Sequence, residues 1–134
     1  MLDASMALAL FFEDEDVVVT AAAVRAIAAD GAVVPSLWRL EVANALRTAV
    51  RRKRCDQAKA DYVLGELAVL PIVVDSETDD RAWSSIRDVS QKEGLTVYDA
   101  AYLELALRLG ATLMSCDREL VACARARGLT VIAP

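Results

Sequence analysis

The sequence predicts a single α/β domain, built on a parallel sheet of about five short strands with helices flanking both faces. Short β-branched runs alternate with helical stretches along the chain, which is typical of a covered parallel sheet. The 134 residues suffice for one domain with its own core, and hydrophobic residues make up 56% of them. Neither a repeat nor a linker divides the sequence, so residues 1–134 are expected to fold as one unit.

Two strands and four helices are expected in the first half of the chain. Only two residues precede Asp3, so the first strand, residues 1–3, is predicted to be unusually short. Gly31 is a natural end for a helix, and Ser36 is a natural N-cap. The acidic run 13–16 is expected to form a solvated loop and a helix cap. Helices are expected over about 5–12, 17–30, 36–53 and 56–70, and a strand over 32–35.

The second half continues the alternation. The run 72–74 reads as a strand that Asp75 closes, and Gly94 and Gly110 are natural helix ends. Further strands are expected over 111–115 and 129–132, and helices over 78–92, 99–109 and 118–127.

Composition removes several classes of function. Histidine is absent, which excludes Ser-His-Asp and Cys-His nucleophilic catalysis and nearly all zinc hydrolase sites. The three cysteines lack C-x-x-C spacing, so reduced thiols are expected. No apolar run in the sequence approaches the ~20 residues that are needed to cross a bilayer. We therefore expect a cytoplasmic protein without membrane contact. The slight apolar excess favours a buried subunit interface, such as that of a homodimer.

Four carboxylates are predicted to meet at one edge of the sheet. Asp3 and Asp117 each end a strand-like run, while Glu41 and Asp99 lie in the first turns of two helices. In open parallel sheets, ligands bind outside the carboxyl ends of the strands. Two charges ~4 Å apart at an effective dielectric near 20 repel by about 4 kcal/mol. The cluster therefore requires bound protons or a cation such as Mg²⁺ or Mn²⁺.

Polar side chains accompany these acids. Asn44 lies three residues after Glu41 on the same helix, so both point into the same region. Ser5 follows Asp3 by two residues, and Ser115 precedes Asp117 by two. Each of these motifs alone is typical of a helix cap. Together they indicate a site, because all of them place acidic or polar residues at the same edge of the predicted sheet.

The four motifs Asp3-Ala-Ser5, Glu41-Val-Ala-Asn-Ala-Leu46, Tyr98-Asp-Ala-Ala-Tyr102 and Ser115-Cys-Asp117 together resemble a PIN domain. More narrowly, the chain is similar to VapC-type ribonuclease toxins of bacterial toxin–antitoxin pairs. The resemblance implies that Asp3, Glu41, Asp99 and Asp117 form a Mg²⁺/Mn²⁺ site that hydrolyses RNA, supported by Ser5, Asn44 and Ser115. It also implies a parallel sheet flanked by helices, a homodimer and inhibition by a cognate antitoxin.

The chemistry of the residues agrees with that implication. A divalent ion held by Asp3 and Asp99, helped by Glu41 and Asp117, would activate water and polarise the scissile phosphate. Asp117 is the carboxylate that we expect to orient the attacking water. The net charge of −5 argues mildly against a nucleic-acid partner, although bound cations would cancel charge where phosphate must lie.

Two alternatives remain open from the sequence. A receiver-like signalling domain would bind Mg²⁺ and accept phosphate on an acid such as Asp75, although the last strand lacks the lysine of that pattern. A catalytically silent PIN-like binding module is the other alternative, and the complete set of acids weighs against it.

Several other residues have both a functional and a plain interpretation. Arg47, Arg51 and Arg54 form a stripe that either touches RNA or is simply solvated. Tyr102 either reaches the acids or packs, and Trp38 and Trp83 are expected to pack in the core or a dimer interface. Cys116 is expected to be a buried thiol, because it points away from its neighbour Asp117.

Overall fold

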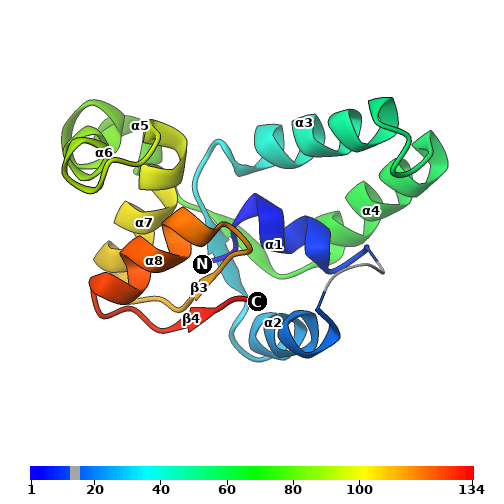
Figure 1. Cartoon of the computed structure of the whole chain (residues 1–134), viewed down its shortest axis with the longest axis horizontal. Coiled ribbons are helices and arrows are strands. Elements are labelled where there is room, and N and C mark those ends of the chain that lie inside the picture. Colours follow the sequence, from blue (N-terminus) through cyan, green and yellow to red (C-terminus); the bar gives the residue numbers. More distant parts are fainter. Residues whose placement is uncertain (13–15) are drawn as a thin grey trace.

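A computed structural model describes residues 1–12 and 16–134 (Figure 1). The predicted loop over Glu13–Glu15 lies outside the described residues, whereas Asp16 caps the next helix as expected, accepting from the backbone N–H of Val18 and Val19. The helices are α1 (Ala4–Ala9), α2 (Val17–Asp30), α3 (Trp38–Arg51), α4 (Gln57–Val69), α5 (Thr78–Arg81), α6 (Arg87–Glu93), α7 (Val97–Leu109) and α8 (Arg118–Ala126). The strands are β1 (Ala32–Val34), β2 (Ile72–Val74), β3 (Leu113–Met114) and β4 (Val131–Ile132).

The strands form two parallel pairs, β1 with β2 and β3 with β4. The N-terminal segment joins these pairs, because Leu2 forms a parallel bridge with Met114 and donates its N–H to the Val33 carbonyl at 3.2 Å. Asp3 donates its own N–H to the Met114 carbonyl at 3.0 Å. The predicted α/β class is confirmed, and the described residues form four short strands and a bridging segment in place of one regular five-stranded sheet.

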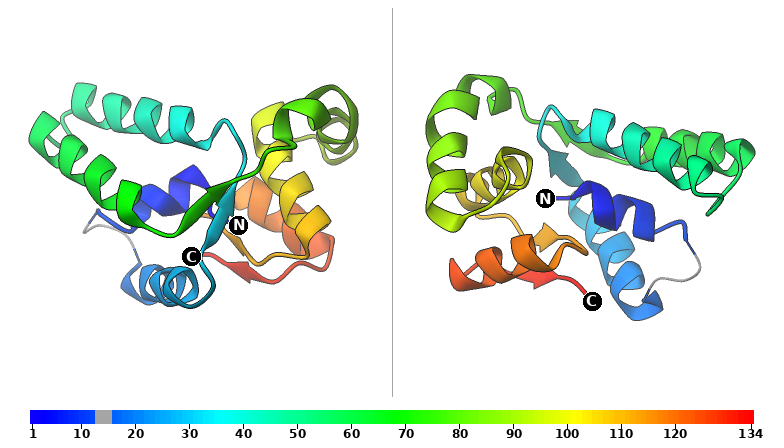
Figure 2. Two further views of the ribbon diagram at one scale, coloured as in Figure 1. Left: turned by 180° about the vertical axis from the view of Figure 1, so that it is seen from behind. Right: turned by 45° about the horizontal axis from the view of Figure 1, so that its top comes forward.

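Helices pack on this sheet and on each other (Figures 1 and 2). Helix α3 lies against α1 and α4, and in Figure 1 the α3–α4 pair reaches out to the side opposite α5 and α6. Helix α8 packs on α7 and β4, and α2 contacts α1 and β4. The described helices do not include one that is both long and apolar enough to span a bilayer.

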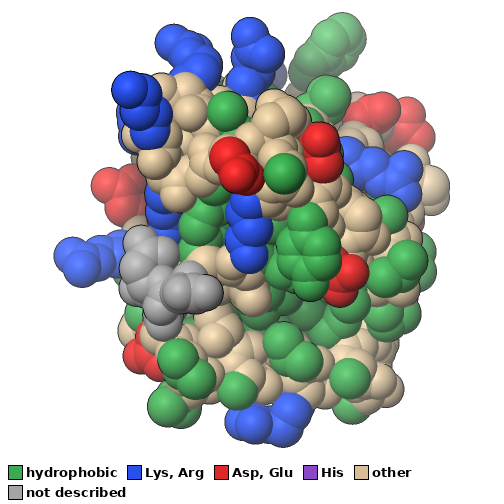
Figure 3. Space-filling view, turned by 90° about the vertical axis from the view of Figure 1, so that its right-hand side faces the viewer, with side chains coloured by type: hydrophobic (Ala, Val, Ile, Leu, Met, Phe, Trp, Pro, Cys, Tyr) green, Lys and Arg blue, Asp and Glu red, His purple; other side chains and the backbone are tan. Residues whose placement is uncertain are grey.

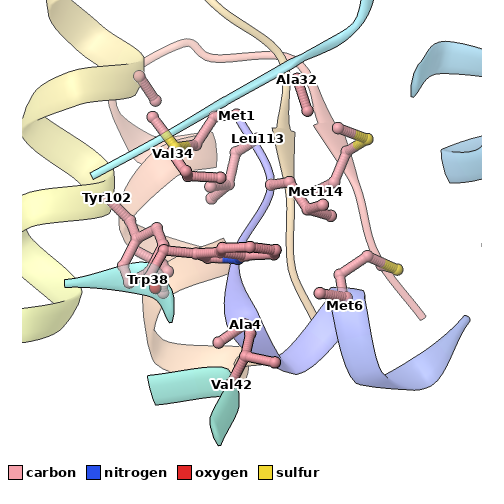
Figure 4. Close-up of a cluster of buried hydrophobic side chains, with 14 of the residues drawn as sticks. Met1, Ala4, Met6, Ala32, Val34, Trp38, Val42, Tyr102, Leu113 and Met114 are labelled. Atoms are coloured by element: carbon pink, nitrogen blue, oxygen red, sulfur yellow. The ribbon is translucent and has the colours of Figure 1, made fainter. Parts of the chain in front are cut away.

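One core occupies the space between these layers. The buried side chains drawn in Figure 4 come from the N-terminal segment, α1, β1, α3, α7 and β3, so the core gathers residues from the whole chain. Leu2, Val34 and Leu113 are fully buried on the central strands, and Trp38 is 4% exposed at the start of α3. This packing fixes the strand ends from which the predicted site residues project.

Two local expectations were wrong. The helix predicted over 78–92 is broken into α5, a π-helical turn over Ala82–Ile86, and α6, with non-helical backbone angles at Ser84. Ser36 does not cap α3: its hydroxyl donates to the Asp79 carboxylate at 2.6 Å, and Leu37 is the N-cap without a side-chain bond. A long-range partner outside the helix therefore displaced the local cap.

Candidate active site

The predicted acids line one cavity of about 470 Å³ at the carboxyl ends of β3 and the N-terminal segment. Its walls come from α1, α3, the α3–α4 turn, the start of α7 and the β3–α8 loop. The site residues predicted from the sequence that line it are Asp3, Ser5, Glu41, Asn44, Asp99 and Asp117. Ser115 lies behind the wall, fully buried, and its hydroxyl donates to Asp3 at 2.7 Å.

Asp3 is the most buried of the four acids, at 6% exposure. Its carboxylate accepts hydrogen bonds from the hydroxyls of Ser5 and Ser115. Burial raises the pKa of Asp3 above its ordinary value, and the two serine hydroxyls oppose that rise by stabilising the charged form. The Ser5 hydroxyl also accepts the backbone N–H of Cys116 at 2.9 Å, which fixes the β3–α8 loop against α1.

Glu41 reaches the cavity from the first turn of α3, where Tyr102 of α7 donates its phenolic O–H to the Glu41 carboxylate. Burial raises the pKa of Glu41, and the negative charges of Asp3 and Asp99 raise it further, against the opposing effect of the tyrosine bond. The pKa of Tyr102 lies above its ordinary value because of burial and the adjacent carboxylates, so the phenol keeps its proton. Asp3 and Asp99 are thus each close enough to Glu41 to repel its charge.

The other two acids take part in helix capping. Thr96 is the N-cap of α7: its hydroxyl accepts the Asp99 N–H at 3.1 Å and donates to the Asp99 carboxylate. Asp117 is the N-cap of α8, accepting the Leu120 N–H at 2.8 Å, and its side chain is exposed. Asp117 therefore lies at the open margin of the cavity, whereas Asp3 lies at its base.

The donor set suits a hard divalent cation. Carboxylate and amide oxygens are the ligands that Mg²⁺ and Mn²⁺ accept, and this cavity provides neither histidine nor thiolate clusters. Within the described residues no group of three or more acids is already arranged as a cage around one point. Mg²⁺ commonly uses one or two carboxylates and keeps several waters, so the residues fit such an ion without a closed cage.

The three arginines of the predicted stripe do not share one surface. Arg54 is the one cation among the described residues that line the cavity, and its guanidinium lies 4.4 Å above the ring of Phe12. Arg47 and Arg51 line a different cavity, between α3 and α4. Figure 3 views the molecule from the side of the α3–α4 turn, where Lys and Arg side chains gather over the upper part of the face. The predicted stripe is thus divided between two surfaces.

Three further expectations are changed by the structure. Cys116 is half-buried and lines the acidic cavity, so the expectation of a buried thiol was wrong. Trp83 is 91% exposed, which excludes the core position, whereas Trp38 is buried as predicted. Asp75 does not line the acidic cavity: it pairs with Arg108 at 2.9 Å and accepts the Thr78 hydroxyl at 2.8 Å.

Sequence patterns alone do not assign two contributors to the site. Thr96 is one of them, although a threonine three residues before an aspartate at a helix start is a capping signal. For Tyr102 the sequence allows two interpretations, packing in the core or contact with the acids. The structure shows both, because Tyr102 is 1% exposed and donates a hydrogen bond to Glu41. The spacing of Asp99 and Tyr102 was the available signal, since residues three apart share a helix face.

The fold and the cavity define a small α/β domain with an acidic, oxygen-lined pocket at the carboxyl edge of a parallel sheet. The PIN domain family model matches residues 1–132, and the chain belongs to that family. PIN domains are generally nucleases, which supports hydrolysis of nucleic acid here.

A solved structure supports the same conclusion. The crystal structure of PAE2754 from Pyrobaculum aerophilum is similar to this chain with a TM-score of 0.68 and 26% identity, covering 98% of this chain and 87% of that one. Among curated proteins, none matches the sequence significantly.

Proposed function

We propose that this protein is a Mg²⁺- or Mn²⁺-dependent endoribonuclease that hydrolyses RNA phosphodiester bonds and acts as the toxin of a toxin–antitoxin pair. The observation that carries the proposal is the shared cavity: Asp3, Glu41, Asp99 and Asp117 come from four separate parts of the sequence and line the same cavity. The family match supports the nuclease chemistry. The resemblance of the four motifs to VapC-type toxins supports the choice of RNA and the toxin role.

Each acid has its own part in the proposed reaction. Asp3 and Asp99 would hold the cation, with Glu41 and Asp117 completing the oxygen donors. When bound, the cation activates water and offsets the charge that develops on the scissile phosphate. Asp117 lies at the open margin and would orient the attacking water, while Ser5 and Ser115 keep Asp3 in place. The proton of Tyr102 stays on the phenol and holds Glu41 toward the cavity.

The test is cleavage of a mixed pool of structured RNAs with Mn²⁺, with Mg²⁺ and with chelator, followed by mapping of the new ends. We expect metal-dependent cuts by the wild-type protein and none by Asp99→Asn, because Asp99 provides a donor and has only a local capping partner. Asp30→Asn, an exposed aspartate at the end of α2, removes the same charge elsewhere and should cleave normally. Equal cleavage by Asp99→Asn would overturn the metal-site assignment.

The toxin role needs a separate experiment. Induced expression in a bacterial host should arrest growth with the wild-type protein and not with Asp99→Asn at an equal protein level. Co-expression of the cognate antitoxin should restore growth and yield a complex in the cytoplasm. Sedimentation of the purified chain tests the proposed homodimer. Growth arrest that persists in Asp99→Asn would reject a toxin that acts by RNA cleavage.

A further inference from the structure

A second cavity, of about 330 Å³, lies next to the acidic one and is lined by two arginines, Arg118 and Arg125. Its wall combines one face of α8 with the residues that follow β4. In Figure 1, α8 lies over β4, and the end of the chain after β4 comes beside the start of that helix. We call this cavity the arginine groove. The motifs that point to the acidic site do not include any of its residues except Cys116.

Helical spacing places the two guanidinium groups on the same wall. Arg118, Val121, Ala122 and Arg125 follow an i, i+3, i+4, i+7 pattern and all line the groove. The two arginines are therefore two turns apart, about 10 Å along the helix axis. Both are exposed, and within residues 1–12 and 16–134 neither guanidinium has a carboxylate partner. Arg127, two residues further on, is by contrast paired with Glu93 at 2.7 Å.

The arginine groove adjoins the acidic cavity. Cys116 lines both cavities, and Asp117, at the margin of the acidic cavity, directly precedes Arg118. A strand whose scissile phosphate lay over the acids would thus have the groove immediately beside it. A groove of about 330 Å³ has room for a sugar–phosphate unit of that strand.

The charge balance favours a phosphate-binding site of this kind beside the acids. The chain carries a net charge of −5, and four of its carboxylates surround the place where the scissile phosphate must lie. Phosphate binding in nucleic-acid proteins depends on Lys and Arg, whose contacts release counterions from the polyanion. Unpaired arginines beside the acids provide that attraction without neutralising the acids themselves.

We propose that the arginine groove binds the backbone phosphates of single-stranded RNA next to the scissile bond, with Val121 and Ala122 as its apolar floor. This inference rests on the proposed ribonuclease function and adds the substrate path to it. Phosphate contacts position a strand and do not read its sequence, so the groove contributes affinity that is independent of sequence.

The test measures RNA binding apart from cleavage. A fluorescein-labelled single-stranded RNA is titrated with the Asp99→Asn protein in EDTA at several salt concentrations, with and without the added pair Arg118→Ala and Arg125→Ala. We expect the pair to weaken binding about 2- to 30-fold at low salt, as for two exposed charge contacts. The slope of log affinity against log salt should fall by about 1.4, since each single-strand phosphate contributes about 0.7.

A matched control removes the same charge elsewhere. Arg25→Ala with Arg87→Ala changes two exposed arginines, on α2 and α6, that line neither cavity. The groove variants should bind RNA more weakly than this control while keeping the same melting temperature. Arg125→Ala alone should show part of the loss, which separates the groove from any disturbance of Asp117 beside Arg118. Affinity and salt slope equal to those of the control would overturn the inference.

Two further outcomes separate this inference from the proposed function. If a labelled poly-glutamate peptide loses binding in the groove variants while RNA does not, the groove is a protein-docking surface and the inference is wrong. Absence of RNA binding by the Asp99→Asn background at low salt would also overturn it. A wild-type protein that binds RNA through the groove, yet leaves it intact with Mn²⁺, would reject the nuclease function alone.

Discussion

The phenolic O–H of Tyr102 on α7 donates a hydrogen bond to the Glu41 carboxylate on α3. This bond links two helices that both contribute walls to the acidic cavity, and it decides where one of the four acids points. Tyr102 is almost fully buried, so its ring belongs to the core while its hydroxyl belongs to the site. Packing and site geometry are therefore coupled at one residue.

Tyr102→Phe removes this donor and keeps the ring. We expect a loss of about 1–2 kcal/mol in the free energy of unfolding, because Glu41 keeps its half-buried charge without a partner. Binding of Mn²⁺ should also weaken, since Glu41 is no longer held toward the cavity. Urea unfolding and calorimetric titration with Mn²⁺ measure the two effects. Tyr98→Phe, an exposed neighbour on the same helix, should change neither, and equal behaviour of both variants would contradict the coupling.

The metal-free protein should lose stability as the pH rises from mildly acidic to neutral. Glu41 and Asp3 have pKa values raised above their ordinary values of 4.5 and 3.8. Their contribution to stability is complete below the ordinary pKa and is lost as the pH rises through the raised value. Glu41→Gln should therefore melt higher than the wild type at neutral pH, with the difference vanishing toward pH 4. Added Mn²⁺ should stabilise the wild type more than this variant.

Thermal melting across that pH range, with EDTA, makes the comparison. Asp30→Asn is the control, because it removes an exposed carboxylate that does not line the cavity. A Glu41→Gln protein that melts below the wild type at neutral pH would show that hydrogen bonding by Glu41 outweighs the repulsion among the acids.

Arg108 holds the region after β2 against α7. It pairs with Asp75 at 2.9 Å, with Glu104 at 3.4 Å and with Glu77 at 3.3 Å, and its side chain is 18% exposed. Arg108→Met should cost about 2 kcal/mol in unfolding free energy, because it leaves the Asp75 and Glu104 carboxylates without this partner. Although burial acts to raise the pKa of Asp75, the Thr78 hydroxyl and Arg108 lower it overall, so the variant should lose less stability than the wild type on acidification. Urea unfolding at pH 7 and at about pH 3, below the ordinary aspartate pKa of 3.8, tests both statements.

Two glycines give opposite expectations for the same substitution. Gly31 has φ 71° and ψ −170°, and a Cβ there would lie 2.9 Å from the Pro71 carbonyl oxygen. Gly31→Ala should therefore destabilise the fold by about 2 kcal/mol. Gly65, within α4, has open space around its Cβ position, and Gly65→Ala should stabilise by about 0.5–1 kcal/mol. Similar changes in both variants, measured by urea unfolding, would contradict this interpretation.

Arg54 and Arg51 are three residues apart in sequence but line different cavities. Arg54→Ala should raise the KM for RNA several-fold, because a cation at the acidic cavity attracts the phosphate. Arg51 lines the α3–α4 cavity instead, so Arg51→Ala should leave the KM for RNA unchanged. Steady-state cleavage of one labelled RNA with Mn²⁺ makes the comparison. Equal KM values for the two variants would show that Arg54 gains no effect on RNA binding from its position at the acidic cavity.

Much of the site follows from sequence because strand ends and helix starts have local signals. The apolar runs before Asp3 and Asp117 place these two acids at strand ends, and the topology of a parallel sheet then brings them to one edge. Helical periodicity places Glu41 and Asp99. These elements can be predicted because they depend on residues that are close together in the sequence.

What the sequence did not reveal depends on contacts between distant segments. The break near Ser84 occurs in a stretch with unbroken helical periodicity, and Ser36 exchanged a local cap for Asp79, 43 residues away. Trp83 is exposed although it adjoins helical apolar positions. The arginine groove was also missed, because it exists only where the residues after β4 meet α8. Long-range packing decides each of these cases, and a local pattern does not encode it.

The placement of Asp3 has a consequence for the timing of synthesis. Its backbone N–H bonds to the Met114 carbonyl and its side chain to the Ser115 hydroxyl, 112 positions later in the chain. A ribosome therefore makes Asp3 112 residues before it makes the serine that orients the Asp3 carboxylate. The nascent chain thus carries this acidic cavity unassembled until Met114 and Ser115 have emerged, so the proposed cleavage of RNA should not begin before these residues are made.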